Sequence, residues 1–352
     1  MLFKPEYTNT IKSEFYDKFK YNKSFWVNLC KNENAIDFLK QNQNKINWLW
    51  LSQNKYAFNL FKDNLDNIYW TWFSSNTNIN AIKLLEENQE KINWNILSKN
   101  DNAIHLLEKN IDKINWYNLS QNKGALHILE QNQDKINWFW LSQNEGVISL
   151  LEKNLDKINW SELSKNEAAI HLLEKHQDKI NWYELSRNEK AIHLLEQHQD
   201  KINWLRLSQN EKAINLLKKN QDKIDWTILC LNKNAIHLLE QNIDKINWSW
   251  LSKNEKAIHL LEQNIDKINW SDLCLNKNAT HLLQQHQDKI NWNLLAKNKN
   301  IGEIICTLNY KKMKENNYIF LEELCSWVFN PDRLNRIAKM YNITLNTLLE
   351  YY

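Results

Sequence analysis

A tryptophan recurs at a nearly fixed interval through most of this 352-residue chain. Neighbouring positions are 22 residues apart, except that Trp94 follows Trp70 by 24. A period in this range is typical of one short supersecondary unit stacked many times, so we expect a repeat protein rather than several compact domains. The thirteen ladder tryptophans are Trp26, Trp48, Trp70, Trp94, Trp116, Trp138, Trp160, Trp182, Trp204, Trp226, Trp248, Trp270 and Trp292.

Each unit follows the pattern W-x-x-L-S-x-N-x-x-A-I-x-L-L-E-x-N-x-D-K-I-N, which predicts two helices. In the unit 182–203, Asn188 occupies the N-cap position of a helix of about three turns. Asn181, directly before this unit, occupies the N-cap position of a helix of about two turns. We expect Glu184 to complete a capping box with Asn181, and His198 to end the second helix in the left-handed conformation. We also expect the recurrent Asn side chains to bind turn backbone in the next unit.

These features predict an all-α fold, a right-handed αα-solenoid of about 13 two-helix repeats of 22 residues. Residues 1–22 are expected to form an N-terminal cap, 23–308 the repeat array, and 309–352 a helical C-terminal cap. We expect the ladder tryptophans to be the interior of the stack and the array to be a rod or arc of order 100 Å at about 10 Å per unit. The alternative is a leucine-rich-repeat horseshoe, with Ile-Asn-Trp as a short strand. The absence of an L-x-x-L-x-L motif favours the helical fold.

The charge balance argues against a polyanion partner. The chain has 45 basic and 42 acidic residues, and Arg occurs only at positions 187, 206, 333 and 336. Because Arg is the usual residue for bidentate phosphate contacts, we do not expect nucleic acid as a partner. Single-stranded nucleic-acid binding by a helical repeat protein remains the alternative function, since the chain has the aromatic residues that such binding uses.

No residue set predicts catalysis. The three Gly and two Pro leave no Gly-rich phosphate loop, and no Ser-His-Asp or Cys-His set stands apart from the repeat. The five Cys form no close pairs, and three of them occupy a repeat position that elsewhere holds Ser. We expect no enzyme activity, no cofactor and no metal. No apolar run is long enough for a membrane span and no signal peptide is recognisable, so we expect an intracellular protein without membrane contact.

One histidine row could suggest a metal site. Packed helices lie about 8–10 Å apart, too far for neighbouring units to share a zinc ion bound at about 2 Å. A partly exposed helix position is therefore the preferred interpretation. The row consists of His105, His127, His171, His193, His237, His259 and His281.

The two positions after each ladder tryptophan vary most, and several of them hold large aromatic residues. Exposed aromatic side chains on a solenoid are the expected anchors for a protein partner. Packing on an adjacent unit is the competing interpretation, which we favour for Trp50 and Trp72. The candidate partner-binding residues are Trp140, Trp250, Tyr117, Phe139 and Tyr183.

The unit resembles a short tandem repeat, DKINW-x-x-L-S-x-N-P-N-A-I-x-L-L-E, of uncharacterised proteins of mimivirus-like giant DNA viruses. The matching residues are 178–182, 185–186, 188 and 191–196, repeated along about 270 residues; 310–316, 322–324 and 330–334 are similar to the segment that closes many of these proteins. This chain departs from them by lacking Pro after the capping Asn and before Asp. The resemblance implies a viral protein inside the cell, in the host cytoplasm or the virion, without catalytic activity. We expect a protein-interaction scaffold or adaptor. The sequence identifies neither its partner nor its oligomeric state.

Overall fold

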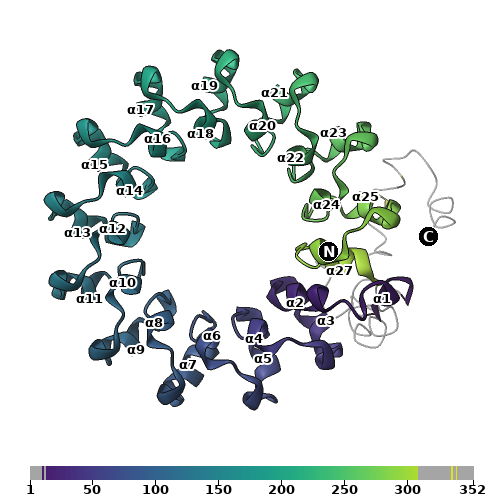
Figure 1. The fold of residues 1–352 in the computed structure, drawn as a ribbon, viewed down its shortest axis with the longest axis horizontal. Helices are drawn as coiled ribbons and strands as arrows, with labels where there is room; N and C mark the ends of the chain where they lie inside the picture. The colour runs from purple at the N-terminus through teal and green to yellow at the C-terminus, as the bar shows by residue number, and fades with distance from the viewer. Residues whose placement is uncertain (1–9, 12, 308–333, 336–337, 339–352) are drawn as a thin grey trace. The chain divides into compact units, whose positions relative to one another are not determined.

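The computed structural model of the protein describes residues 10–11, 13–307, 334–335 and 338. In this part of the chain the repeats form an α-solenoid, so the predicted helical repeat fold is confirmed. Each repeat contributes a first helix to an inner row and a second helix to an outer row (Figure 1). The predicted caps remain predictions, because 1–9, 12 and most of 309–352 lie outside the described residues.

The first helices contain the ladder tryptophans, and the second helices contain the Ile-x-Leu-Leu block. The first helices are α2 (Lys23–Lys31), α4 (Trp48–Leu51), α6 (Trp70–Phe73), α8 (Trp94–Leu97), α10 (Trp116–Leu119), α12 (Trp138–Leu141), α14 (Trp160–Leu163), α16 (Trp182–Leu185), α18 (Trp204–Gln209), α20 (Trp226–Leu229), α22 (Trp248–Ser252), α24 (Trp270–Leu273) and α26 (Trp292–Leu295). The second helices are α3 (Ile36–Gln41), α5 (Phe58–Phe61), α7 (Ile79–Glu87), α9 (Ile104–Glu108), α11 (Leu126–Gln131), α13 (Ile148–Glu152), α15 (Ile170–Lys175), α17 (Ile192–Gln197), α19 (Ile214–Lys219), α21 (Ile236–Glu240), α23 (Ile258–Gln263), α25 (Thr280–Gln285) and α27 (Ile301–Ile305).

The helices are shorter than predicted. In the repeat that begins at Trp182, α16 has four residues and α17 has six, and the 3-10 turns η14 (Glu189–Ala191) and η15 (Gln199–Lys201) flank α17. The chain leaves the helical conformation at Asn188, which is extended with φ −73° and ψ 115°. Such short helices are stable only through their neighbours, because one turn of helix barely offsets its nucleation cost.

Both predicted N-caps are present. The Asn181 side chain accepts a hydrogen bond from the Glu184 N–H, and the Asn188 side chain accepts one from the Lys190 N–H. The predicted capping box is wrong in its second half, because the Asn181 N–H donates to the Ser164 hydroxyl of the preceding repeat. The left-handed residue predicted at His198 is also wrong: its φ is −127°, and the chain continues directly into η15.

Asn188 and its equivalents also join neighbouring repeats. The Asn188 Nδ2 donates to the carbonyl oxygen of Ser164 at 3.2 Å, in the preceding repeat rather than the predicted next one. In several repeats the same amide reaches a second carbonyl, as Asn54 does with Cys30 and Asn32 at 3.1 and 3.2 Å. These Asn side chains are buried, so their polar atoms need the partners that they have.

Leucine, alanine and isoleucine, rather than tryptophan, fill the core between repeats. Leu185, Ala191 and Leu195 are fully buried, and so are their equivalents in most of the other repeats. The prediction that the ladder tryptophans are interior is wrong for all except Trp26, since the other twelve are only half-buried. Trp26 differs because aromatic rings at Phe19 and Phe38 cover it.

A buried hydroxyl four residues after the ladder tryptophan links consecutive repeats. The Ser164 Oγ donates to the Trp160 carbonyl oxygen at 2.7 Å and accepts the Asn181 N–H at 3.0 Å. At Cys230 the thiol does the same, with the Trp226 carbonyl oxygen at 3.2 Å and the Asn247 N–H at 3.3 Å. Cysteine therefore substitutes for serine here as a small buried group with weak hydrogen-bonding capacity.

The first and last repeats contact each other, which corrects the expectation of an open rod or arc. The Asn32 Nδ2 donates to the carbonyl oxygens of Ala296 and Asn298 at 3.0 and 2.8 Å. Asn32 holds the repeat position of Asn54 and Asn188, and its two acceptors hold the positions of Cys30 and Asn32 in the Asn54 contact. The array of residues 14–304 thus closes on itself (Figure 1).

Further contacts at this seam, the interface of repeats one and thirteen, also follow the pattern used elsewhere. Two more side-chain amides cross it, Asn28 to the Asn293 carbonyl at 3.0 Å and Asn34 to the Lys299 carbonyl at 2.9 Å. They reproduce the bonds of Asn118 to Asn95 and of Asn234 to Glu211 inside the array. α1 (Ser13–Phe19) adds a contact of its own, with the Phe15 and Phe19 rings 5.4 and 5.7 Å from the Trp292 ring.

Outside the array, the chain forms a second unit of residues 1–13 and 305–352. In it the structure describes a pair of two-residue strands, β1 (Thr10–Ile11) antiparallel to β2 (Cys306–Thr307). Among the described residues, no helix has the length and apolar character that crossing a membrane requires.

Candidate partner-binding surface

The five candidate partner-binding residues all lie on first helices, in the inner row of the array. Tyr117, Phe139, Tyr183 and Trp250 are exposed by 50%, 44%, 46% and 36%, whereas Trp140 is half-buried. Their exposure follows from the helix itself. The first helices that contain these five residues are about one turn long and bury the leucine at the fourth position, so their second and third positions point away from that leucine.

Three of the candidates form one group, which we call the aromatic cluster: Tyr117, Phe139 and Trp140. The Trp140 ring lies 5.6 Å from the Tyr117 ring and 5.1 Å from the Phe139 ring, both edge to face. This geometry is favourable for aromatic pairs and holds the rings in fixed positions. The aromatic cluster thus has two exposed rings, Tyr117 and Phe139, that pack against the half-buried Trp140 ring. It spans two adjacent repeats.

The other two candidates are isolated and covered in part by cations. The Arg206 guanidinium lies over the Tyr183 ring at 4.5 Å, and the Lys253 ammonium lies over the Trp250 ring at 5.2 Å. Cation–π contacts of this kind stabilise an exposed ring by about 0.5–1 kcal/mol. These two residues therefore do not join the aromatic cluster.

Trp50 and Trp72, for which packing is the preferred interpretation, do pack on each other. Their rings are stacked with centroids 6.2 Å apart, and the Lys31 ammonium lies 3.5 Å from the centre of the Trp50 ring. Trp72 still has 38% of its surface exposed.

The sequence analysis missed a polar pocket beside Tyr183. The repeat that contains α16 and the repeats before and after it line a cavity of about 400 Å³ with Lys165, Glu167, Glu184, Arg187, Asn188 and Arg206. We call this the arginine pocket, because residues 14–304 contain no other arginine. The Arg206 Nε is buried and has no hydrogen-bond partner. The sequence signal for this pocket is the pair of arginines in an array whose other basic residues, apart from histidine, are lysines.

Carboxylates in and next to the arginine pocket offset part of its charge. The Lys165 ammonium lies 2.9 Å from the Glu162 carboxylate and 3.9 Å from that of Glu184. Glu162 is buried and also accepts a hydrogen bond from Gln143. The pocket lining keeps three cations against two carboxylates.

The exposed faces of the ladder tryptophans carry lysines. The Lys135 ammonium, in the D-K-I-N block, lies 4.8 Å from the centre of the Trp116 ring. Equivalent pairs occur in seven more repeats: Lys91–Trp70, Lys113–Trp94, Lys157–Trp138, Lys201–Trp182, Lys223–Trp204, Lys245–Trp226 and Lys267–Trp248. In these repeats the ladder tryptophan therefore packs against a lysine of the D-K-I-N block, and this contact is part of the structure of the array.

The histidine row is paired with glutamates of the preceding repeat. His171 and His193 lie 2.7 Å from Glu152 and Glu174, and their side chains are partly exposed. His237 instead contacts Glu240 of its own helix at 3.4 Å, because the preceding repeat has Lys218 at the glutamate position. In the part of the chain that the structure describes, no three His, Cys, Asp or Glu side chains are grouped to hold a metal ion.

The buried cysteines are poor nucleophiles. Burial raises the pKa of the Cys30 thiol to about 11, and burial also raises the pKa values of Cys230 and Cys274. A thiol needs a lowered pKa and access to solvent to react readily, and these three have neither.

Comparison of the chain with protein-family models, with curated proteins and with solved structures found no match in any of the three.

Proposed function

We propose that the chain is a non-enzymatic protein-interaction scaffold and that the aromatic cluster is its main contact with a protein partner. The observation that carries this proposal is the grouping of Tyr117, Phe139 and Trp140 on adjacent first helices, with the first two exposed by 50% and 44%. Tyrosine and tryptophan are enriched among residues that dominate binding energy at protein interfaces, since they combine apolar area with a hydrogen-bonding group.

The arginine pocket extends this surface and adds charge. It lies in the repeats that follow the aromatic cluster, and the Gln143–Glu162 hydrogen bond joins the two regions. Arginine guanidinium groups bind carboxylates with defined geometry. The proposed partner therefore presents apolar side chains to the cluster and acidic side chains to Arg187 and Arg206.

The proposed setting is the interior of a cell infected by a giant virus, which rests on the resemblance of the repeat. Affinity capture from such cells, with the chain carrying Trp140→Ala or Tyr117→Ala, tests the function. Tyr56→Ala is the matched control, because Tyr56 is 54% exposed but lies on the 3-10 turn η4 (Lys55–Ala57) outside the inner row. We expect a partner that both cluster variants lose and the control retains.

Two outcomes would contradict the proposal. The first is that no captured protein depends on Trp140 or Tyr117 although circular dichroism shows the variants folded. The second is capture of nucleic acid, with an affinity that falls steeply with salt. That result would favour the single-stranded nucleic-acid alternative.

A further inference from the structure

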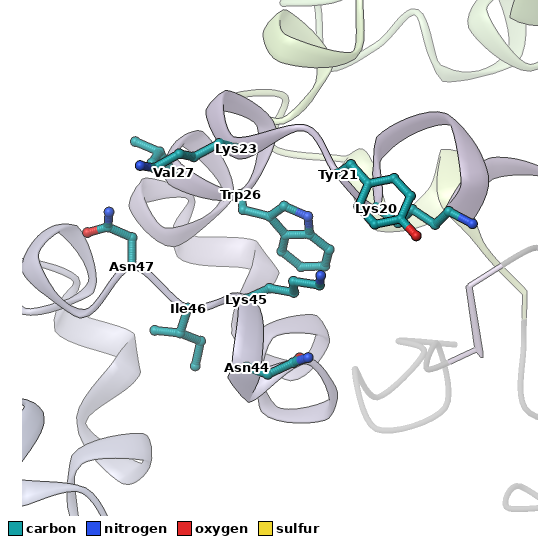
Figure 2. Close-up of a pocket in the computed structure, with 9 residues that line it drawn as sticks. All are labelled: Lys20, Tyr21, Lys23, Trp26, Val27, Asn44, Lys45, Ile46 and Asn47. Carbon is teal, nitrogen blue, oxygen red and sulfur yellow. The ribbon is translucent and has the colours of Figure 1, made fainter.

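A second pocket lies at the start of the array, away from the aromatic cluster. It has a volume of about 330 Å³, within the range of small-molecule sites. None of the residues that line it is acidic. We call it the lysine pocket, and Figure 2 shows its lining: Lys20, Tyr21, Lys23, Trp26, Val27, Asn44, Lys45, Ile46 and Asn47.

Trp26 places an unused hydrogen-bond donor in this pocket. The residue is only 4% exposed, and its indole Nε1 has no hydrogen-bond partner. In Figure 2 the nitrogen edge of the indole faces the side of the pocket where Tyr21 and Lys20 lie. A buried donor without an acceptor is destabilising, so an acceptor atom from a ligand would be bound favourably here.

The surroundings of Trp26 explain why this donor is unique among the ladder tryptophans. Its ring is stacked on Phe38 with centroids 5.5 Å apart and lies against Phe19 and Phe25 at 6.0 and 5.7 Å. Trp292 has two such aromatic neighbours, Phe15 and Phe19, and like the other ladder tryptophans it is only half-buried.

Lys45 departs from the repeat pattern in the same pocket. Its position is the one from which Lys135 and seven others lie over their ladder tryptophans. In the first repeat the Lys45 ammonium instead lies 5.9 Å from the centre of the Tyr21 ring, and Lys20 approaches the same ring at 5.1 Å. The Tyr21 ring is 85% exposed. Lys45 therefore lies beside a largely exposed ring, unlike the equivalent lysines that lie over ladder tryptophans.

The helix that begins at the pocket adds positive potential. α2 starts at Lys23, with Asn22 as its N-cap, and has no acidic residue in its first turn. A basic residue at a helix N-terminus is normally unfavourable, because the helix dipole already places positive charge there. An anion in the pocket would turn this unfavourable arrangement into a favourable one.

We propose that the lysine pocket binds the phosphate group of a small phosphorylated compound. The Trp26 Nε1–H donates to a phosphate oxygen, and the ammonium group of Lys45, which lies on the same side of the indole in Figure 2, neutralises part of its charge. The pocket lining has three lysines, and one of them, Lys20, has an acidic partner, Asp17, at 2.6 Å. This excess of positive charge favours a doubly charged phosphate over a singly charged carboxylate. This site is independent of the partner contact proposed for the aromatic cluster.

The test follows the indole signals of the intact chain labelled with ¹⁵N-tryptophan, in which Trp26→Phe assigns the Trp26 signal. Inorganic phosphate is added against potassium chloride of equal ionic strength. We expect a saturable shift of the Trp26 signal with phosphate alone. Lys45→Gln should weaken binding about tenfold through the loss of one charge-assisted contact.

Lys135→Gln is the matched control, because Lys135 holds the same repeat position but lies over Trp116. It should leave phosphate binding unchanged, and the Trp116 signal should not move with phosphate. A Trp26 shift that chloride reproduces, or equal weakening by both lysine variants, would overturn the proposal. So would binding to phosphatidylglycerol vesicles without binding to phosphate, since the site would then be a lipid contact.

Discussion

Asn32 donates a hydrogen bond to the carbonyl oxygen of Asn298, 266 residues further along the chain, at 2.8 Å. Asn54 makes the equivalent bond to Asn32, its neighbour one repeat away, at 3.2 Å. The seam is thus built like any other interface of the array. Terminal repeats of a solenoid ordinarily need polar caps over their apolar faces, but here the two faces cover each other.

Asn32→Ala should weaken both sides of the seam although they are far apart in the sequence. The variant removes the Asn32 donor from the carbonyl groups of Ala296 and Asn298, of which Asn298 keeps the Ile301 N–H at 3.2 Å. We expect a loss of about 1–3 kcal/mol of unfolding free energy. Hydrogen exchange should become faster in α2 and in α26 together.

Asn188→Ala is the control in the middle of the array. It removes the bond to the Ser164 carbonyl, so faster exchange should be confined to the two repeats that this bond joins. If Asn32→Ala accelerated exchange in α2 and its sequence neighbours but not in α26, the seam would not be closed in solution.

Closure could not be predicted from the repeat pattern, for a physical reason. The pattern determines which residues are buried between neighbours, and these contacts are the same in an open and a closed array. Whether thirteen repeats meet depends on the small rotation that each interface adds, which accumulates along the array. One residue does distinguish the last repeat in the sequence. It has Ala296 at the position where the other repeats have the linking serine or cysteine.

Ala296 is consistent with the structure of the first repeat. In the other repeats the linking serine or cysteine accepts the N–H of the residue before the next ladder tryptophan, as Ser164 does from Asn181. The corresponding residue in the first repeat is Phe25, whose N–H already donates to the Asn22 side chain. No hydroxyl is needed across the seam, so alanine is sufficient.

The candidate surface was predictable only residue by residue. Variation after the ladder tryptophan identified Tyr117, Phe139 and Trp140 as candidate partner-binding residues, and the structure places these three together, with Trp140 half-buried. Their grouping depends on side-chain directions in one-turn helices, which the repeat pattern does not specify. The arginine pocket was missed because its residues come from three repeats and no single unit carries the pattern.

Ser164→Ala should destabilise the array more than Ser164→Cys. Alanine leaves the partly buried Asn181 N–H without an acceptor, at a cost of about 1–3 kcal/mol. Cysteine keeps a weak acceptor, as Cys230 shows with Asn247 at 3.3 Å. Urea denaturation gives the two free energies, and Ala296→Ser should be close to neutral. Equal losses for the two Ser164 variants would show that a thiol does not replace the hydroxyl in the linking hydrogen bond.

The three buried cysteines should resist alkylation in the folded chain. Burial raises the pKa of Cys30 to about 11, so little thiolate forms near pH 8, and the side chain is fully buried. Iodoacetamide followed by peptide mass spectrometry should leave Cys30, Cys230 and Cys274 unmodified until denaturant is added. Rapid labelling of Cys30 in native buffer would mean that the first repeat opens readily at the seam.

Glu240→Gln should change how stability depends on pH. A hydrogen bond from His259, at 2.6 Å, and a weaker one from His237 lower the pKa of the Glu240 carboxyl. A lowered folded-state pKa contributes stability above the unfolded value of about 4.3, and this contribution is lost as pH falls through the folded value. Wild type should therefore be more stable than Glu240→Gln at about pH 6, and the difference should shrink toward about pH 3.

Glu196→Gln is the matched control for this prediction, because the next repeat presents Asn215 at the position where seven repeats present a histidine of the row. Urea denaturation at intervals across this pH range should show the same small difference from wild type at every pH for Glu196→Gln. A pH-independent difference for Glu240→Gln as well would mean that the histidine row contributes packing without ion pairing. A difference confined to Glu240→Gln would show that histidine and glutamate of consecutive repeats interact as charged partners along the outer row.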